Sequence, residues 1–199
     1  MDMPTIKSAT ADDQAAAVAV VTLGFSGDPM TRWTWPDPAV YLEAFPRFVR
    51  AFAGKAFEHG TAYYAEGYAG AALWLPPDVH PDGEALSALM ESTVPAEIRK
   101  DLFEVVAQME TYHPHEAHWF LPLIGVDPAK QGQGYGGALM RHALERCDRE
   151  GRLAYLDATS PRSRALYERH GFERLGTVQV GSSPTFVLML RRPRRPAGG

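Results

Sequence analysis

The sequence predicts one mixed α/β domain of the α+β class, and three observations lead to this prediction. Helical spacing of apolar residues over 96–112 follows two strand-like runs at 61–64 and 70–75. An apolar run at 119–126 precedes a glycine-rich segment and an amphipathic pattern over 134–150, which predicts a strand, a loop and a helix. The length of 199 residues, with 45% hydrophobic, suits a single domain with a sizeable core.

The first part of the chain predicts a strand, two helices and a hairpin. Thr10 is placed to cap the first helix, with Asp13 for the reciprocal contact, and Gly24 is expected to end it. The runs at 61–64 and 70–75, joined by Ala-Glu-Gly, predict an antiparallel hairpin. The elements expected before the hairpin are a strand at 5–8, a helix at 12–23, a segment at 25–38 rich in Gly, Pro and Trp, and a helix with Tyr41, Leu42, Phe45, Phe48, Val49 and Phe52 at helical spacing, closed by Gly60.

The second part of the chain predicts helices alternating with strands. The strand at 119–126 is expected to be central, and Gly151 to be the C-cap of the helix at 134–150. The remaining elements are a short helix at 84–91, a helix at 96–112 with Ile98, Leu102, Val105, Val106 and Met109 on one face, a strand at 153–157, a short helix at 163–170, and strands at 172–180 and 185–190.

The segment after the run at 119–126 has the composition of a phosphate-binding loop. Its glycines lack Cβ, so the backbone takes unusual dihedral angles and comes close to a ligand. At a helix N-terminus the unpaired N–H groups and the positive end of the helix dipole both favour an anion. The residues expected to contact the phosphates are Gln131, Gly132, Gln133, Gly134, Tyr135, Gly136 and Gly137.

Two other glycine motifs compete for this segment. A P-loop needs Lys and Ser or Thr after its last glycine, but Ala138 and Leu139 follow Gly137, so a P-loop is excluded. The dinucleotide fingerprint G-x-G-x-x-G is matched from Gly132, with Asp157 downstream. In that fold the first glycine follows the strand directly, whereas Asp-Pro-Ala-Lys-Gln intervenes here, and its proline cannot extend a strand ladder. The dinucleotide interpretation is therefore the weaker alternative.

Two separate motifs, in the right order, resemble those of the Gcn5-related N-acetyltransferase (GNAT) family. The first is Gln131-x-x-Gly134-x-Gly136, preceded by Gly-Val-Asp-Pro at 125–128. The second is Ala-Leu-Tyr-Glu-Arg-His-Gly-Phe at 165–172. The resemblance runs from about residue 118 to residue 190, since the first half of such proteins diverges widely.

The resemblance implies a central, mostly antiparallel sheet with one parallel pair, and helices on both faces. It also implies that acetyl-CoA binds as co-substrate in a gap where two neighbouring strands separate. Within the family the chain looks most like puromycin N-acetyltransferase and its relatives, which share the runs at 119–121 and 160–162. Besides the loop, the residues that the resemblance assigns to acetyl-CoA binding are Ile124, Gly125, Val126 and Ser163, the last standing where those relatives carry Asn.

Acetyl transfer to an amine needs a neutral nucleophile, a polarised thioester and a proton for the departing thiolate. The resemblance places Tyr167 at the sulfur of the cofactor. A phenol with a reference pKa of about 10 is protonated at neutral pH, so Tyr167 is a suitable donor, although its ring would also pack the short helix on the sheet. Asp157 is the candidate base, because some relatives carry Glu there. Glu66, Glu110, Glu116 and His118 are the other candidates.

The resemblance also implies where the acceptor binds. Phe25, Asp28 and Trp33, together with Trp35, lie in a segment that commonly borders the acceptor pocket in this family. An aromatic wall with an acid would suit a small cationic amine, so a primary amine of a small molecule is the expected acceptor. Two alternatives stay open. In the first alternative, the acceptor is a protein or peptide. In the second, the chain is a non-catalytic domain that binds CoA and acts as a sensor.

Composition excludes several partners. A net charge of −4 argues against nucleic acid, and no early apolar run is long enough to span a bilayer. The start Met-Asp-Met-Pro lacks a basic signal region, so a cytoplasmic enzyme, monomer or homodimer, is expected. The domain is expected to cover 1–190, with 191–199 as a basic, flexible and solvated tail.

The histidines and the single cysteine could suggest a metal site and a covalent acyl carrier, but their sequence patterns favour neither. His113, His115 and His118 lie in a proline-bearing loop without the spacing of a structural zinc site, so no metal is expected. Cys147 shares a helix face with Met140 and other apolar residues, which predicts a buried core position instead of a covalent acyl carrier.

Overall fold

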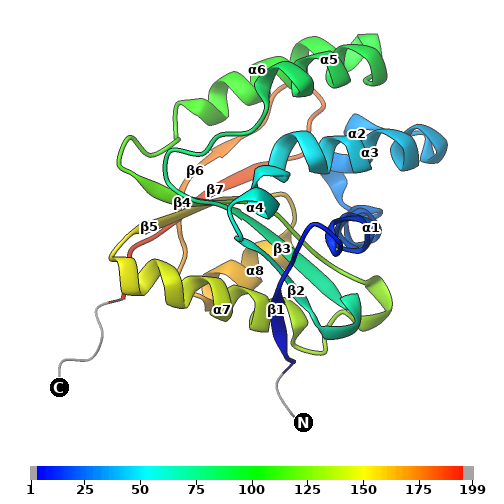
Figure 1. Ribbon diagram of the computed structural model, residues 1–199. Coiled ribbons are helices and arrows are strands. Elements are labelled where there is room, and N and C mark those ends of the chain that lie inside the picture. The colour runs from blue at the N-terminus through cyan, green and yellow to red at the C-terminus, as the bar shows by residue number, and fades with distance from the viewer. Residues whose placement is uncertain (1–3, 195–199) are drawn as a thin grey trace, which may run out of the picture.

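A seven-stranded sheet forms the centre of the computed structural model, which describes residues 4–194 (Figure 1). The strands are β1 (Ile6–Ser8), β2 (Ala62–Ala65), β3 (Gly70–Leu75), β4 (His118–Val126), β5 (Leu153–Ala158), β6 (Glu173–Val178) and β7 (Phe186–Arg191), in the spatial order β1-β2-β3-β4-β5-β7-β6. Neighbouring strands pair antiparallel except β4 with β5, which are parallel. The predicted sheet, with its single parallel pair and central β4, is confirmed.

Helices cover both faces of the sheet, as expected. The helices are α1 (Gln14–Phe25), α2 (Pro29–Thr34), α3 (Pro38–Ala53), α4 (Lys55–Glu58), α5 (Gly83–Thr93), α6 (Ala96–Glu110), α7 (Tyr135–Glu150) and α8 (Pro161–Arg169), with 3-10 turns η1 (Glu66–Tyr68) and η2 (Pro128–Lys130). Helices α1 to α6 share one hydrophobic cluster with the sheet, and α7 and α8 share the other (Figure 1). Alternation along β3 decides which cluster each residue joins: Leu73 and Leu75 join the first, Ala72 and Trp74 the second.

Gly24 does not end the first helix, because α1 continues to Phe25. A Cβ on Gly24 would lie 2.9 Å from the Cα of Gly125, and a Cβ on Gly125 would lie 2.8 Å from the Cα of Val21. The two glycines therefore let α1 lie backbone to backbone against β4. The start of α1 differs in part from the prediction. The helix begins at Gln14, and the Thr10 hydroxyl donates to Asp13 instead of capping the helix, but the Asp13 carboxylate accepts the Thr10 backbone N–H as predicted.

Helix α2 lies inside the Gly-, Pro- and Trp-rich segment, where the pattern did not predict one. Its start signals were present, since the Asp28 carboxylate accepts from the backbone N–H groups of Met30 and Thr31, and Pro29 occupies the first turn. A second expectation was wrong on α6: Val106, placed on the buried face, is 51% exposed.

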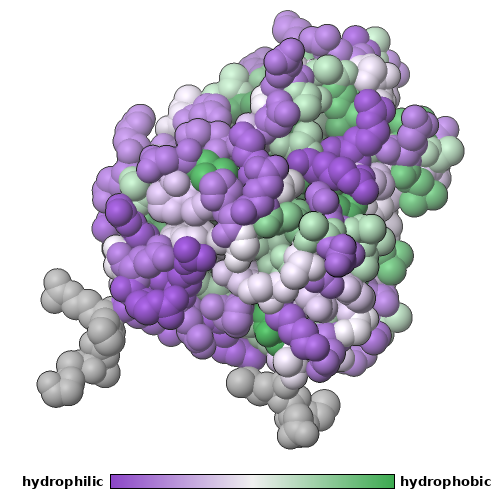
Figure 2. Space-filling view, in the orientation of Figure 1, coloured by the Kyte–Doolittle hydropathy of each residue, from purple (hydrophilic) through white to green (hydrophobic). Residues whose placement is uncertain are grey.

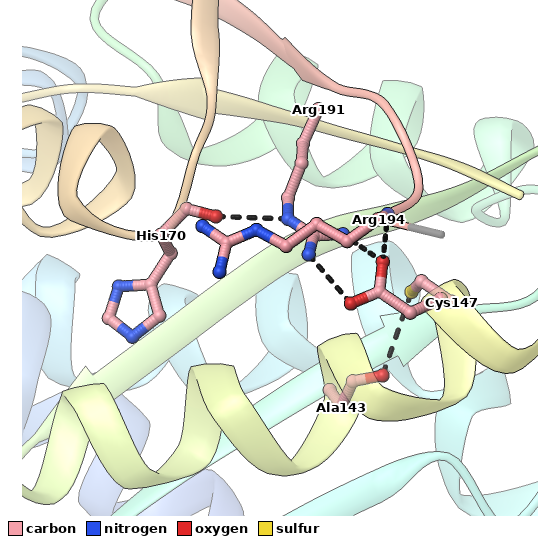
Figure 3. Close-up of polar contacts among 6 residues, drawn as sticks. Ala143, Cys147, His170, Arg191 and Arg194 are labelled. Atoms are coloured by element: carbon pink, nitrogen blue, oxygen red, sulfur yellow. Dashed lines mark hydrogen bonds and ion pairs between the residues drawn. The ribbon is translucent and has the colours of Figure 1, made fainter. Parts of the chain in front are cut away.

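Arg191, expected in a solvated tail, is instead the last residue of β7 and only 3% exposed. Its guanidinium binds both oxygens of Asp148 on α7 at 2.7 and 2.8 Å, and its Nε donates to the carbonyl of His170 at the end of α8 (Figure 3). The backbone N–H of Arg194 also donates to Asp148. The chain is thus anchored beyond residue 190, while residues 195–199 of the predicted tail lie outside the described part.

Breaking this ion pair should destabilise the fold. Burial alone would raise the pKa of Asp148, but hydrogen bonds from Arg191 and Arg194 hold it below its ordinary value. Asp148→Ala leaves a buried guanidinium unpaired, and because Asp148 is partly exposed we expect a loss of about 2 to 3 kcal/mol, below the range for fully buried pairs. The pKa of Asp148 is lower in the folded protein than in the unfolded chain. The contribution of the ion pair to stability is therefore present above the unfolded pKa and is lost as pH falls through the folded pKa.

Urea unfolding of Asp148→Ala at pH 7 and below pH 4 tests this expectation. The matched control is Glu168→Ala, which removes an exposed pair with Arg164 at 3.5 Å and should cost under about 1 kcal/mol. Equal losses in the two variants would show that the buried pair adds nothing special.

Cys147 is 1% exposed in the cluster under α7, as predicted, and burial raises the pKa of its thiol to about 12. Its Sγ lies 3.6 Å from the Ala143 carbonyl (Figure 3). A protonated, buried thiol is a poor acyl acceptor.

Figure 2 shows a largely hydrophilic face broken by separate hydrophobic patches. Within the described residues, no helix is long and apolar enough to cross a membrane.

Candidate active site

Strands β4 and β5 separate halfway along their length. They pair from His118 with Leu153 to Leu121 with Leu156, and the ladder stops there although both strands continue. The next residue of β4 is Pro122, which has no N–H to donate. Beyond it, the side of β4 that faces β5 has main-chain groups without a strand partner.

A cavity of about 1740 Å³ lies at this separation. Its lining residues come from the loop before α7, α8, the α1–α2 turn, α3, α5 and α6. Every residue predicted to bind the cofactor lines it, namely Ile124, Gly125, Val126, Gln131, Gly132, Gln133, Gly134, Tyr135, Gly136, Gly137 and Ser163. Residues from three separate segments are thus brought to one space.

The glycine-rich loop has the backbone that its sequence predicts. Gly132 and Gly134 have φ of 81° and 91°, values that side-chain-bearing residues rarely adopt, and Gly134 is the N-cap of α7. Gln131 fixes the loop on both sides: its Nε2 donates to the Val126 carbonyl, and its Oε1 accepts from Arg162 on α8. The first amides of α7 thereby open toward the cavity, where an anion would be favoured.

The basic and the acidic residues that line the cavity come from different elements. The basic lining residues come from η2, α7 and α8 and are Lys130, Arg141, Arg162 and Arg169. The acidic lining residues lie elsewhere and are Asp28, Asp78, Glu110, Glu116 and Asp157. An anionic group is therefore favoured beside the basic residues, and a cationic group beside the acidic ones.

Tyr167 lies on α8 and its side chain is buried, with 5% of the residue exposed. Burial raises the pKa of its phenol above the ordinary value, and the carboxylates of Asp28 and Asp157 raise it further. The hydroxyl is therefore protonated at neutral pH and lines the cavity. Packing and proton donation are both compatible with this position, since the ring also contacts Phe172.

Asp157 lies on β5 just past the last pairing with β4, opposite Leu188 of β7. Desolvation raises the pKa of its carboxyl to about 7, Glu110 adds to the rise, and the Tyr155 hydroxyl offsets part of it. Its Oδ1 is buried without a hydrogen-bond partner. A carboxylate of this kind takes up a proton readily near neutral pH, as a general base must.

The other candidate bases divide into two groups. Glu66 is paired with Lys7 at 2.7 Å where β1 meets β2 and does not line the cavity. Glu110, Glu116 and His118 do line it. Nε2 of His118 lies 3.1 Å from Nε2 of His113. Among residues 4–194, no group of three or more metal-ligating side chains is arranged to hold an ion.

The three predicted acceptor residues have different positions. Phe25 and Asp28 line the cavity, but the Asp28 carboxylate already caps α2 and accepts from the Thr159 hydroxyl. Trp33 does not line the cavity, because its indole points to Ser182 and donates to that hydroxyl at 3.0 Å. The expectation for Trp33 was therefore wrong, whereas Trp35 lines the cavity.

Sequence reasoning missed several lining residues. Tyr155 was detectable, since residues two apart on a strand point to the same side and Asp157 was already a candidate. The aromatic residues Phe45, Phe48 and Phe52 were predicted only as the apolar face of a helix, and they line the cavity as well. Arg162, which holds Gln131, gave no local signal.

Comparison with known proteins gives a match to one domain model and a shared fold. Residues 98–174 match the model of the acetyltransferase (GNAT) domain. A Corynebacterium glutamicum structure described as histone acetyltransferase HPA2 and related acetyltransferase is 24% identical, covers 99% of this chain and 100% of that one, and has a TM-score of 0.69.

Two insect structures share the fold at lower identity. Mosquito arylalkylamine N-acetyltransferase like 5b is 14% identical and Drosophila melanogaster polyamine N-acetyltransferase is 19% identical. Each covers 94% of this chain and 99% of its own, with a TM-score of 0.65. The domain match contains the glycine-rich loop and α8, and the shared fold extends it over nearly the whole chain. Residues 98–174 of this protein are thus similar to the GNAT acetyltransferase domain, and nearly the whole chain shares the fold of these structures.

Proposed function

We propose that this protein transfers an acetyl group from acetyl-CoA to the primary amine of a small molecule, by direct attack in a ternary complex. One observation carries the proposal: a single cavity leads from the N-terminus of α7, through the gap between β4 and β5, to Tyr167 and Asp157. Solved structures with the same fold are named for arylalkylamine and polyamine acceptors, which supports a small amine. We also propose kinship with the puromycin N-acetyltransferase-like members, from the shared runs at 119–121 and 160–162.

The residues present fit a phosphorylated, extended co-substrate. A Cβ placed on Gly132 or Gly134 would meet nothing within 4 Å, so the loop has open space beside it. The amides of the loop and of the first turn of α7 would hold the pyrophosphate, with Lys130 and Arg162 nearby. The unpaired main-chain groups of β4 around Ile124 would bind the pantetheine arm as a strand partner does.

Acetyl-CoA, when bound, supplies the acetyl thioester. Asp157 would accept a proton from the ammonium of the acceptor, directly or through a water, so that a neutral amine attacks. The buried Tyr167 hydroxyl would hold a proton for the departing sulfur. Cys147 is buried on α7 and does not line the cavity, so the proposal uses no acyl-enzyme on this thiol.

An acceptor screen tests the proposed function. Purified protein is incubated with acetyl-CoA and small primary amines, and free thiol and acetylated product are measured. Product with an amine and no stable acetyl-protein without one is the expected result. A protein that binds CoA but forms no product with amines or peptides would instead be a sensor of acyl-CoA.

The loop assignment predicts a selective loss of CoA binding. Gly134→Val places a branched residue at φ 91° beside the cavity, so we expect at least about a tenfold weaker Kd for CoA together with a stability loss of roughly 1 to 2 kcal/mol. Gly151→Val is the matched control, because Gly151 is the C-cap of the same helix at φ 64°, also with open space, and does not line the cavity. Calorimetric titration decides, and equal Kd values in the two folded variants would refute the assignment.

A further inference from the structure

We infer that the acceptor is an amine with one cationic nitrogen and an aromatic ring two or three bonds away, and that the aromatic side chains of the cavity select it over polyamines. The inference rests on the proposed function and deepens it. Three features of the cavity carry it: a continuous row of rings, exposed apolar side chains of α6, and a single buried carboxylate oxygen without a partner.

The row of rings leads toward Asp157. Successive ring centroids lie 5.0 to 5.9 Å apart, at angles from stacked to edge-on. Its last member, Tyr155, lies two residues before Asp157 on β5, and so on the same side of that strand. All members line the cavity, and they are Trp35, Phe45, Phe48, Phe52, Phe120 and Tyr155.

Helix α6 adds exposed apolar side chains to the lining. Phe103 and Val106 of α6 line the cavity and are 40% and 51% exposed, although residues of this type are ordinarily buried. Met90 of α5 and Met109 of α6 line the cavity beside them. We place the ring of the acceptor in a slot between these side chains and Phe48 and Phe52, the partly exposed members of the row.

The charges allow one deep cationic nitrogen. The Asp28 carboxylate is engaged with the α2 amides and with Thr159. Asp78, Glu110 and Glu116 are exposed, so water screens their attraction for a cation. Asp157 alone offers a buried oxygen without a partner among the described carboxylates. A second ammonium or guanidinium would lose its hydration beside the aromatic rings, and no buried carboxylate would pair with it.

Matched acceptors separate these possibilities. With saturating acetyl-CoA, kcat/KM is measured for 2-phenylethylamine, butylamine, agmatine and spermidine. We expect kcat/KM for 2-phenylethylamine to exceed that of agmatine and spermidine by about tenfold or more, with butylamine between them. Agmatine or spermidine turning over as well as 2-phenylethylamine would overturn the inference while leaving the proposed function intact.

A variant of the exposed side chains of α6 tests the slot without disturbing the core. Phe103→Ala should lower kcat/KM for 2-phenylethylamine about three- to tenfold and leave butylamine within twofold. Leu42→Ala is the control, because Leu42 is 65% exposed and does not line the cavity, so both amines should be unaffected. Equal losses for both amines in Phe103→Ala would refute a slot for the ring. A protein that neither binds CoA nor acetylates any amine would refute the proposed function itself.

Discussion

Tyr167→Phe is expected to lower kcat for a good acceptor by about a hundred to ten thousand fold, with little change in the Kd for CoA. The substitution removes one oxygen and keeps the ring, so the contact with Phe172 and the packing of α8 survive. The departing thiolate loses its proton donor, and general acid terms are typically of this size. Stopped-flow measurement of thiol release, with calorimetry for CoA, gives the two quantities separately.

Tyr63→Phe is the matched control for this substitution. Tyr63 is also buried in the cluster beneath α7, at 6% exposure, but it does not line the cavity. It should therefore keep kcat within about twofold. If another step limits the native enzyme, the loss at Tyr167 will be smaller, and a solvent isotope effect should then appear in that variant. A Tyr167→Phe enzyme with native kcat and no isotope effect would assign the proton to water.

The predictable parts of this molecule are those that local sequence determines. Gly132 and Gly134 are needed for backbone angles within one loop, so their spacing was visible in the chain. The order of helices and strands followed from periodicity in the same way. The start of α2 was equally local, because Asp28 and Pro29 are cap and first-turn residues, but the abundance of Gly, Pro and Trp around them obscured the signal.

Features that depend on distant segments were not predictable. Arg191 looked like part of a solvated basic tail because its partner Asp148 lies 43 positions away. Trp33 looked like an acceptor residue, yet Ser182, from the far end of the chain, accepts its N–H. The acceptor slot that we propose combines helices α3, α5 and α6, whose apolar faces resemble ordinary core faces in sequence. Only the tertiary arrangement separates a side chain that lines a cavity from one that fills the core.

The pKa of Asp157 leads to a prediction that joins catalysis to stability. A base with a pKa of about 7 is half ionised there, so kcat should rise with pH and level off above about 7. Asp157→Asn removes the base, and we expect kcat to fall by about a hundred to ten thousand fold and the rising limb to disappear. A pH profile of kcat between about 5 and 9 measures both.

Stability gives an independent readout at the same residue. The folded pKa of Asp157 is raised above the unfolded value of about 3.9, so the folded state binds this proton more tightly. The stabilisation that comes from protonating Asp157 is fully present below the unfolded pKa and is lost as pH rises through about 7. Native protein should therefore lose stability between pH 5 and pH 8 relative to Asp157→Asn, as urea unfolding at the two pH values would measure.

Glu110→Gln separates the base from its surroundings. The charge of Glu110 raises the pKa of Asp157, so its removal should move the rising limb of kcat to lower pH while kcat on the plateau stays within a few fold. This shift distinguishes a Glu110 that only tunes the pKa of Asp157 from a Glu110 that is itself the base. Loss of the base would remove the rising limb of the pH profile instead of moving it. Glu110 would instead be the base if Asp157→Asn kept the rising part of the pH profile of kcat and Glu110→Gln lost it. A limb that persists in both variants would leave deprotonation of the amine to water in the cavity.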